Sequence, residues 1–222
     1  YRDNKYWVVK RSDVLQWITE NAFTIAIAGT HGKTTTTSMT AHILRHTGYG
    51  CNAFLGGIAT NYGTNFWSHE KNVVVVEADE YDRSFLKLAP NIAVITAVDP
   101  DHLDIYGTAE EVVKAFGEFS DKIKPGGVLI QKWGTEFNTN TSNKTVHSYG
   151  YNHNEASYHT SNLKVVEGSY HFDLVHPAGI CKDIILNMGG LHNVENVSAA
   201  IAIALSLGIE EVKIKEAVAS FA

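Results

Sequence analysis

One stretch of the sequence has the spacing of a phosphate-binding loop. Residues 26–38 read AIAGTHGKTTTTS, an apolar run followed by two glycines, a lysine and four threonines. Glycines allow backbone N–H groups to turn inward around an anion, a following helix directs its positive N-terminus there, and lysine adds a full charge. The hydroxyl after the lysine can bind the Mg²⁺ that accompanies a nucleoside triphosphate. Phosphate binding is therefore predicted for Gly29, Thr30, His31, Gly32, Lys33, Thr34 and Thr35.

This loop is shorter than the general P-loop pattern GxxxxGK[ST]. That pattern requires glycine at position 27, where this chain has Ile27, so the stretch reads GxxGKT. The competing interpretation is an ordinary glycine turn that caps a helix, with the threonines in its first turn. The apolar run before the loop and the helical pattern after it favour phosphate binding, because a phosphate loop requires both.

Two further polar clusters follow apolar runs. The first, EADEYD at residues 77–82, places four carboxylates within six residues, and these repel one another unless a cation lies among them. Since Mg²⁺ binds carboxylate and phosphate oxygens, we predict a metal ligand at Glu77; a solvated acidic turn is the alternative. The second, DPDHLD at residues 99–104, contains His102. Histidine is an unusual Mg²⁺ ligand. These residues alone therefore do not distinguish three roles for His102: a metal ligand, a hydrogen-bond partner of a ligand, or a contact at a helix N-terminus.

The elements that must position these clusters are those of an α/β fold. Short apolar, mostly β-branched runs are typical of parallel strands that helices cover on both faces. Strands are expected at 23–28, 72–76, 92–98 and 128–130, and helices at 34–47, 110–124, 194–207 and 212–221. The alternation predicts an open, mostly parallel sheet flanked by helices and similar to a P-loop NTPase, in which ligands bind beyond the carboxyl ends of the strands. A loop is expected at Gly56 and Gly57, and the alternating residues 137–188 predict a small β-rich insertion or edge of short antiparallel strands.

Composition limits the class of protein. The 222 residues, 44% of them hydrophobic, suffice for one domain, and no apolar run is long enough for a membrane span. A net charge of -6 disfavours nucleic-acid binding. Two distant cysteines, Cys51 and Cys181, suit a reducing compartment and predict buried thiols; a cytoplasmic location is expected. Histidines of the β-rich segment lack metal-site spacing and are interpreted as solvated: His147, His153, His159, His171 and His176.

Four motifs in order resemble the central ATP-binding domain of the Mur ligases. They are the loop at 29–35, EADEYD at 77–82, DHLD at 101–104 and GLHNVEN at 190–196. Within the family, His31 and the form of the acidic motif resemble the branch that adds L-alanine to UDP-N-acetylmuramate. The resemblance covers essentially the whole chain.

This resemblance implies a reaction of peptidoglycan synthesis. ATP phosphorylates the lactyl carboxylate of UDP-N-acetylmuramate, and the amine of L-alanine attacks the acyl phosphate to form an amide. Lys33 would hold the β- and γ-phosphates, Thr34 and Glu77 a first Mg²⁺, and His102 would contribute to a second metal. Implied adenine or ribose contacts are His192, Asn193 and Asn196; without the resemblance, helix capping by Asn193 is the simpler interpretation.

The family's UDP-binding N-terminal domain and its C-terminal domain, which closes over ATP, are not expected in this chain. Because it opens at Tyr1, we interpret residues 1–222 as a single central domain of a longer ligase, with a lead-in segment at 1–21. The isolated chain is expected to hold most ATP and Mg²⁺ contacts without ligating. Alternatives are the recycling ligase that joins a murein tripeptide to UDP-N-acetylmuramate, and a nucleotide-binding regulatory module or scaffold without ligase activity. The stretches SFLKLAP at 84–90 and PDHLDIY at 100–106 favour the L-alanine branch over the recycling ligase.

Overall fold

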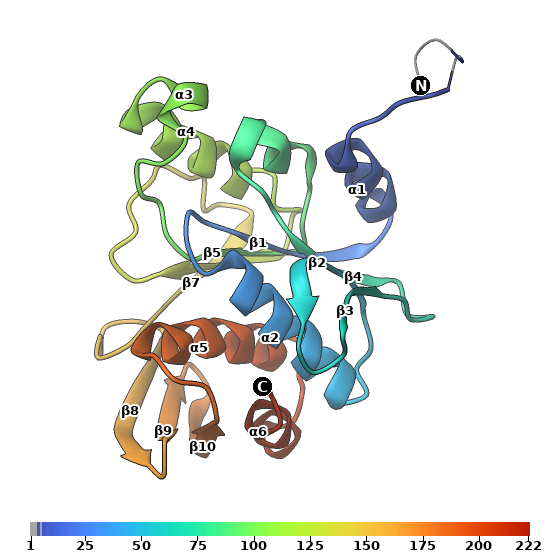
Figure 1. Cartoon of the computed structure of the whole chain (residues 1–222). Coiled ribbons are helices and arrows are strands. Elements are labelled where there is room, and N and C mark those ends of the chain that lie inside the picture. Colours follow the sequence, from blue (N-terminus) through green and yellow to red (C-terminus); the bar gives the residue numbers. More distant parts are fainter. Residues whose placement is uncertain (1–3, 5) are drawn as a thin grey trace.

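One mixed sheet of ten strands organises the chain in the computed structural model, which describes residue 4 and residues 6–222 (Figure 1). The strand order is β10-β9-β8-β7-β6-β5-β1-β4-β2-β3. The strands are β1 (Phe23–Ala28), β2 (Asn52–Ala59), β3 (Thr64–Trp67), β4 (Val73–Glu77), β5 (Ile92–Ile95), β6 (Gly127–Lys132), β7 (Lys144–Gly150), β8 (Tyr158–Val166), β9 (Ser169–His176) and β10 (Gly179–Leu186).

The parallel centre of this sheet confirms the predicted fold class. β1 pairs in parallel with β4 on one side and with β5 on the other, and β2 and β6 continue the parallel pairing outward. Nearly all side chains of β1, β4 and β5 are buried, as expected for strands covered on both faces. β5 ends at Ile95, earlier than the expected end at 98, and the hydroxyl of Thr96 donates to Ala28 O and His31 O.

Helices cover both faces of the sheet. They are α1 (Arg11–Glu20), α2 (Lys33–His46), the 3-10 segment η2 (Tyr81–Lys87), α3 (Leu103–Tyr106), α4 (Ala109–Ser120), α5 (Leu191–Ser206) and α6 (Glu211–Ala219). Figure 1 shows α2, α5 and α6 on one face, with α1, α3 and α4 on the other. A separate apolar core lies on each face, and the alanines of α5, which include Ala199 and Ala200, let it pack closely on the first of them.

The β-rich second half continues the central sheet. β7 pairs in parallel with both β6 and β8, which differs from the antiparallel arrangement expected for this segment; the pairs β8–β9 and β9–β10 are antiparallel. Several elements were not anticipated from the sequence: α1, within the segment 1–21, the short helical segments η2 and α3, and the β2–β3 hairpin. The expected loop at Gly56 and Gly57 is wrong, since both lie within β2, where glycines replace the alternating side chains that would have indicated a strand.

Both cysteines are buried, which confirms the expectation for Cys51 and Cys181. Among the described residues, no helix is both long enough and apolar enough to cross a membrane.

Candidate functional site

The candidate site lies at the carboxyl ends of β1, β4 and β5. The loop at 29–32 follows β1, and α2 begins directly at Lys33 with Gly32 as its left-handed N-terminal cap. A side chain at Gly29 would meet the backbone, because its Cβ would lie 2.8 Å from Ala97 N. The first glycine therefore permits the close approach of the loop to the segment after β5, and the second permits the turn into the helix.

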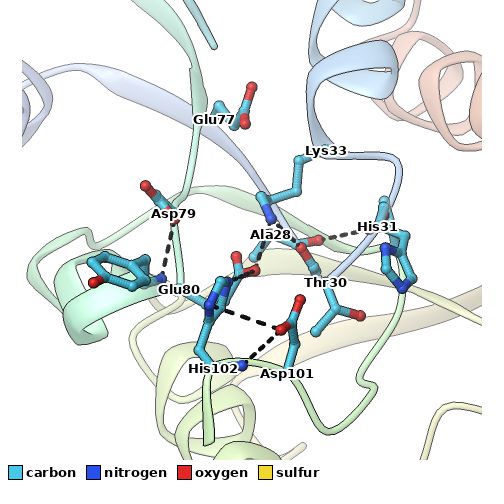
Figure 2. A network of polar contacts seen from close by, with 12 residues as sticks. Ala28, Thr30, His31, Lys33, Glu77, Asp79, Glu80, Asp101 and His102 are labelled. Atoms are coloured by element: carbon cyan, nitrogen blue, oxygen red, sulfur yellow. Dashed lines mark hydrogen bonds and ion pairs between the residues drawn. The ribbon is translucent and has the colours of Figure 1, made fainter. Parts of the chain in front are cut away.

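Lys33 folds back across its own loop. Its Nζ donates hydrogen bonds to Gly29 O at 2.7 Å and to Glu80 Oε1 at 2.8 Å (Figure 2). The side chain keeps 15% of its surface exposed. The lysine thus lies at the mouth of the loop, where its charge faces any anion bound by the backbone N–H groups.

Thr34 and Glu77 form an oxygen-rich pair at the start of α2. Thr34 Oγ1 donates to Glu77 Oε1 at 3.1 Å, and Gly56 N of β2 donates to Glu77 Oε2 at 3.1 Å. Hydroxyl and carboxylate oxygens this close, at a solvent-accessible helix start, are the donor set that Mg²⁺ takes together with phosphate oxygens and water. The residues present therefore fit a magnesium ion.

His102 lies in a second group, apart from Glu77 (Figure 2). Its Nε2 is 3.8 Å from Glu80 Oε1, and its backbone N donates to Asp101 Oδ1 at 2.7 Å. Its φ of 54° is left-handed, which is uncommon for a residue with a side chain. The structure brings His102 to Glu80 rather than to Glu77, whose partners are Thr34 and Gly56. Across the described chain, no three His, Cys, Asp or Glu side chains gather as a metal cluster.

Thr30 and His31 of the loop lie against Asp99, in the segment after β5. Thr30 Oγ1 donates to Asp99 Oδ2 at 3.1 Å and accepts from Asp99 N at 3.1 Å, which ties the two loops together. His31 is exposed, with Nε2 3.7 Å from Asp99 Oδ2, and Thr35 is half-buried in the first turn of α2.

A cavity of about 250 Å³ opens beside this loop, toward α5. It is lined by His31, Gly32, Thr96, Ala97, Asp99, Lys132, Tyr149, His192, Glu195 and Asn196. The predicted nucleoside contacts His192 and Asn196 thus reach the same cavity, whereas Asn193 lies beneath it, 4% exposed, and donates to Gly189 O at 2.6 Å. Asn193 is not the helix cap, because α5 is capped by Gly190.

Asn196 connects the two parts of the predicted nucleotide site. Its Oδ1 accepts from Thr36 Oγ1 of α2 at 3.2 Å, and its Nδ2 donates to Asn193 Oδ1 at 3.2 Å. A Cβ on Gly32 would lie 2.7 Å from the same Oδ1. α5 therefore packs against the loop through this amide, and the absence of a side chain at Gly32 makes the contact possible.

Sequence reasoning missed several residues of the site. Glu80 belongs to the acidic motif, yet nothing in the motif distinguishes it from its neighbours. Lys132 and Glu195 pair at 2.7 Å in the wall of the cavity, beside buried Tyr149, although 63 positions separate them. No local sequence pattern predicts this pair, because Lys132 of β6 and Glu195 of α5 meet only when α5 packs on the folded sheet.

Tyr106 supports the acidic motif from below. Its hydroxyl donates to Glu80 O at 2.6 Å, and burial, with the nearby Glu80 carboxylate, raises the pKa of Tyr106 to about 12. The hydroxyl therefore stays protonated and remains a donor over the whole physiological pH range.

Comparison with known proteins agrees with this geometry. The family model described as the Mur ligase middle domain matches residues 27–204. A UDP-N-acetylmuramate--L-alanine ligase of Phocaeicola vulgatus is 46% identical over 100% of this chain and 48% of its own length. The chain thus spans about half the length of the curated relatives it matches.

Solved structures share the fold. The UDP-N-acetylmuramate-alanine ligase of Thermotoga maritima superposes with a TM-score of 0.80 and 27% identity, covering 95% of this chain and 47% of that one. The UDP-N-acetylmuramate:L-alanyl-gamma-D-glutamyl-meso-diaminopimelate ligase of Neisseria meningitides gives 0.79 at 23% identity, covering 97% and 76%, and this shows the fold alone. With the family model matched over most of its length, the chain belongs to the Mur ligase family.

Proposed function

We propose that this chain is the nucleotide-binding domain of an ATP-dependent ligase that joins L-alanine to the lactyl carboxylate of UDP-N-acetylmuramate. The observation that carries the proposal is the convergence of Lys33, Thr34 and Glu77 at neighbouring strand ends, in a loop that leads directly into α2. The substrates are those in the names of relatives 43–46% identical over the whole chain.

Each part of the site has a role in this proposal. Backbone N–H groups of the loop and the N-terminus of α2 bind the phosphates, and Lys33 adds its charge to them. Thr34 and Glu77 hold Mg²⁺, which when bound neutralises the charge of the phosphates during phosphoryl transfer. The cavity lined by His192 and Asn196 takes the nucleoside, with Asn193 fixing Asn196 from beneath.

The chain acts as the central domain of a longer protein in this proposal. UDP-N-acetylmuramate and L-alanine are substrates of that whole protein, whose product serves peptidoglycan synthesis and, through it, cell shape and division. We place it in the cytoplasm, where its two buried thiols remain reduced. The 222-residue chain by itself is expected to bind ATP and Mg²⁺ without forming the amide.

Calorimetric titration with a non-hydrolysable ATP analogue and Mg²⁺ tests the binding role in the full-length protein. Wild type is expected to bind, Lys33→Ala to bind much more weakly, and Lys122→Ala, which removes an exposed lysine elsewhere, to bind as wild type does. Equal binding by Lys33→Ala and wild type would contradict the assignment of the loop.

Acceptor dependence tests the reaction. Phosphate release by the full-length protein is expected to require both UDP-N-acetylmuramate and L-alanine, and L-alanine is expected to outcompete a murein tripeptide. Release that is independent of both acceptors would instead favour a regulatory nucleotide-binding module, and preference for the tripeptide would favour the recycling ligase.

A further inference from the structure

The Glu80 side chain is a buried carboxylate that the proposed reaction does not yet use. It lies where β4 gives way to η2, its side chain is 2% exposed, and its Oε1 is 2.8 Å from Lys33 Nζ. Its other oxygen, Oε2, is buried without a hydrogen-bond partner. Burying a carboxylate is costly unless it is paired, so a half-paired one beside a phosphate loop calls for a functional explanation.

The geometry of the Lys33 ammonium supplies the first part of that explanation. An ammonium has three N–H donors and no acceptor. Two of its hydrogen bonds go to Gly29 O and Glu80 Oε1, both on the protein side of the loop. The third donor is left for a ligand at the mouth of the loop, so Glu80 does not need to release Lys33 when a phosphate arrives.

The second part comes from His102 on a different loop. Its Nε2 lies 3.8 Å from the same Oε1, within ion-pair range but beyond a hydrogen bond. Figure 2 shows Lys33 and His102 reaching Glu80 from separate segments of the chain. One carboxylate therefore lies beside both Lys33, which the proposed function places at the phosphates, and His102, which the family resemblance implies at a second metal.

The backbone of Glu80 is fixed as well. Tyr106 Oη donates to Glu80 O at 2.6 Å, and Arg83 N donates to the same oxygen at 3.0 Å. Tyr106 ends α3, the helix that His102 caps, so the loop that carries His102 is connected to Glu80 through both its ends. A displacement of Glu80 is therefore expected to displace His102 as well.

We propose that Glu80 is a positioning residue that holds the Lys33 ammonium with one donor directed at phosphate and couples it to the placement of His102. The inference rests on the proposed function, since it assigns Glu80 a role toward the nucleotide of that same site. Glu80 itself touches neither substrate nor reacting atoms.

Three variants of the full-length protein test this role. Glu80→Gln keeps the shape and one acceptor but removes the charge, Glu80→Asp keeps the charge but withdraws it by one methylene, and Glu155→Gln removes an exposed carboxylate elsewhere. Calorimetry with Mg²⁺ and a non-hydrolysable ATP analogue is expected to give about tenfold weaker binding for Glu80→Gln, a smaller loss for Glu80→Asp and none for Glu155→Gln.

A double-mutant cycle separates positioning from a purely structural role. If Glu80 acts through Lys33, Glu80→Gln is expected to change the dissociation constant much less in a Lys33→Ala background than in wild type. In a second cycle, the effects of Glu80→Gln and His102→Ala on kcat are expected to be less than additive, because Glu80 acts partly through His102. A structural role would instead lower the melting temperature, with the Glu80→Gln and Lys33→Ala effects on binding fully additive.

The outcomes distinguish the inference from the function beneath it. Binding by wild type and Glu80→Gln with equal affinity, or full additivity in both cycles, would overturn the role of Glu80 and leave the nucleotide site intact. No binding by wild type would overturn both. Should Glu80→Gln not fold, Glu80→Asp decides: binding about threefold weaker or more supports the role, and unchanged binding refutes it.

Discussion

Gly56 gives a sharp test of Thr34 and Glu77 as magnesium ligands, because a methyl group at position 56 would displace the Glu77 carboxylate while Glu77 itself is not mutated. Gly56 lies within β2, and its N donates to Glu77 Oε2 at 3.1 Å. A Cβ at this position would overlap the Glu77 carboxylate, whose Cδ would be 2.7 Å away. The obstacle is the end of a flexible side chain, so Gly56→Ala is expected to turn the carboxylate away from Thr34 rather than disturb the strand.

Two effects of opposite sign follow. Gly56 does not have a left-handed φ, so alanine is accommodated, and the reduced entropy of the unfolded chain is expected to stabilise the fold by about 0.4–1 kcal/mol. Meanwhile the displaced Glu77 loses a hydrogen bond of the charge-assisted kind, worth about 1.5–3 kcal/mol. If about 1.4 kcal/mol of this reaches the metal, Mg²⁺-dependent affinity for nucleotide falls about tenfold.

Calorimetry with the ATP analogue, in Mg²⁺ and in chelator, measures this effect, and thermal unfolding measures stability. Gly57→Ala is the matched control, since its Cβ would meet only Thr34 Cγ2, at an ordinary 3.5 Å. Gly56→Ala is expected to bind weakly in Mg²⁺ and to melt below the wild-type temperature, because the lost hydrogen bond outweighs the gain from the unfolded chain. Wild-type Mg²⁺ dependence in Gly56→Ala would refute the assignment of Glu77 as a metal ligand.

Three further predictions concern the loop, a histidine and the thiols. Gly29→Ala would push its Cβ to 2.8 Å from Ala97 N at a φ of 136°, so loss of nucleotide binding together with a lower melting temperature is expected. Burial lowers the pKa of His42 below its ordinary 6.5, so the unfolded chain binds the proton more readily; the free energy of unfolding should fall as pH drops below about 6.5, and less steeply in His42→Gln. Burial raises the pKa of Cys51 to about 12 and that of Cys181 to about 11, so a thiol reagent at pH 8 should label neither until denaturant is added.

The elements that the sequence predicted well are those whose pattern is local. Each central strand is a continuous apolar run, because helices cover both its faces, and such runs are visible without knowledge of neighbours. The turn from β1 into α2 was equally predictable, because the spacing of Gly29, Gly32 and Lys33 is a local pattern. The Mur ligase family followed from the order of the four motifs, and resemblance to its L-alanine-adding branch from His31 and the form of the acidic motif; relatives named UDP-N-acetylmuramate--L-alanine ligase match the whole chain.

Other elements escaped because their pattern is weak or non-local. β2 contains Gly56 and Gly57, which give no alternating side chains, and only pairing with β4 and β3 makes this segment a strand. The sequence of β7 resembles that of the antiparallel strands after it. Its parallel pairing with β6 depends on the path of the connecting segment 133–143, which the local pattern does not show.

At the site, the sequence by itself determined which residue types meet at the strand ends: glycines, a lysine, a hydroxyl and carboxylates in the order a phosphate loop needs. Tertiary structure decided which carboxylate each group meets. Glu77 pairs with Thr34, whereas Glu80, three positions later, pairs with Lys33 and approaches His102. The physical reason is that β4 ends between the two residues: Glu77 is the last residue of the strand, whereas Glu80 lies in the turn that leads into η2. The direction of that turn is fixed by tertiary contacts, such as the hydrogen bond from Tyr106 of α3 to Glu80 O.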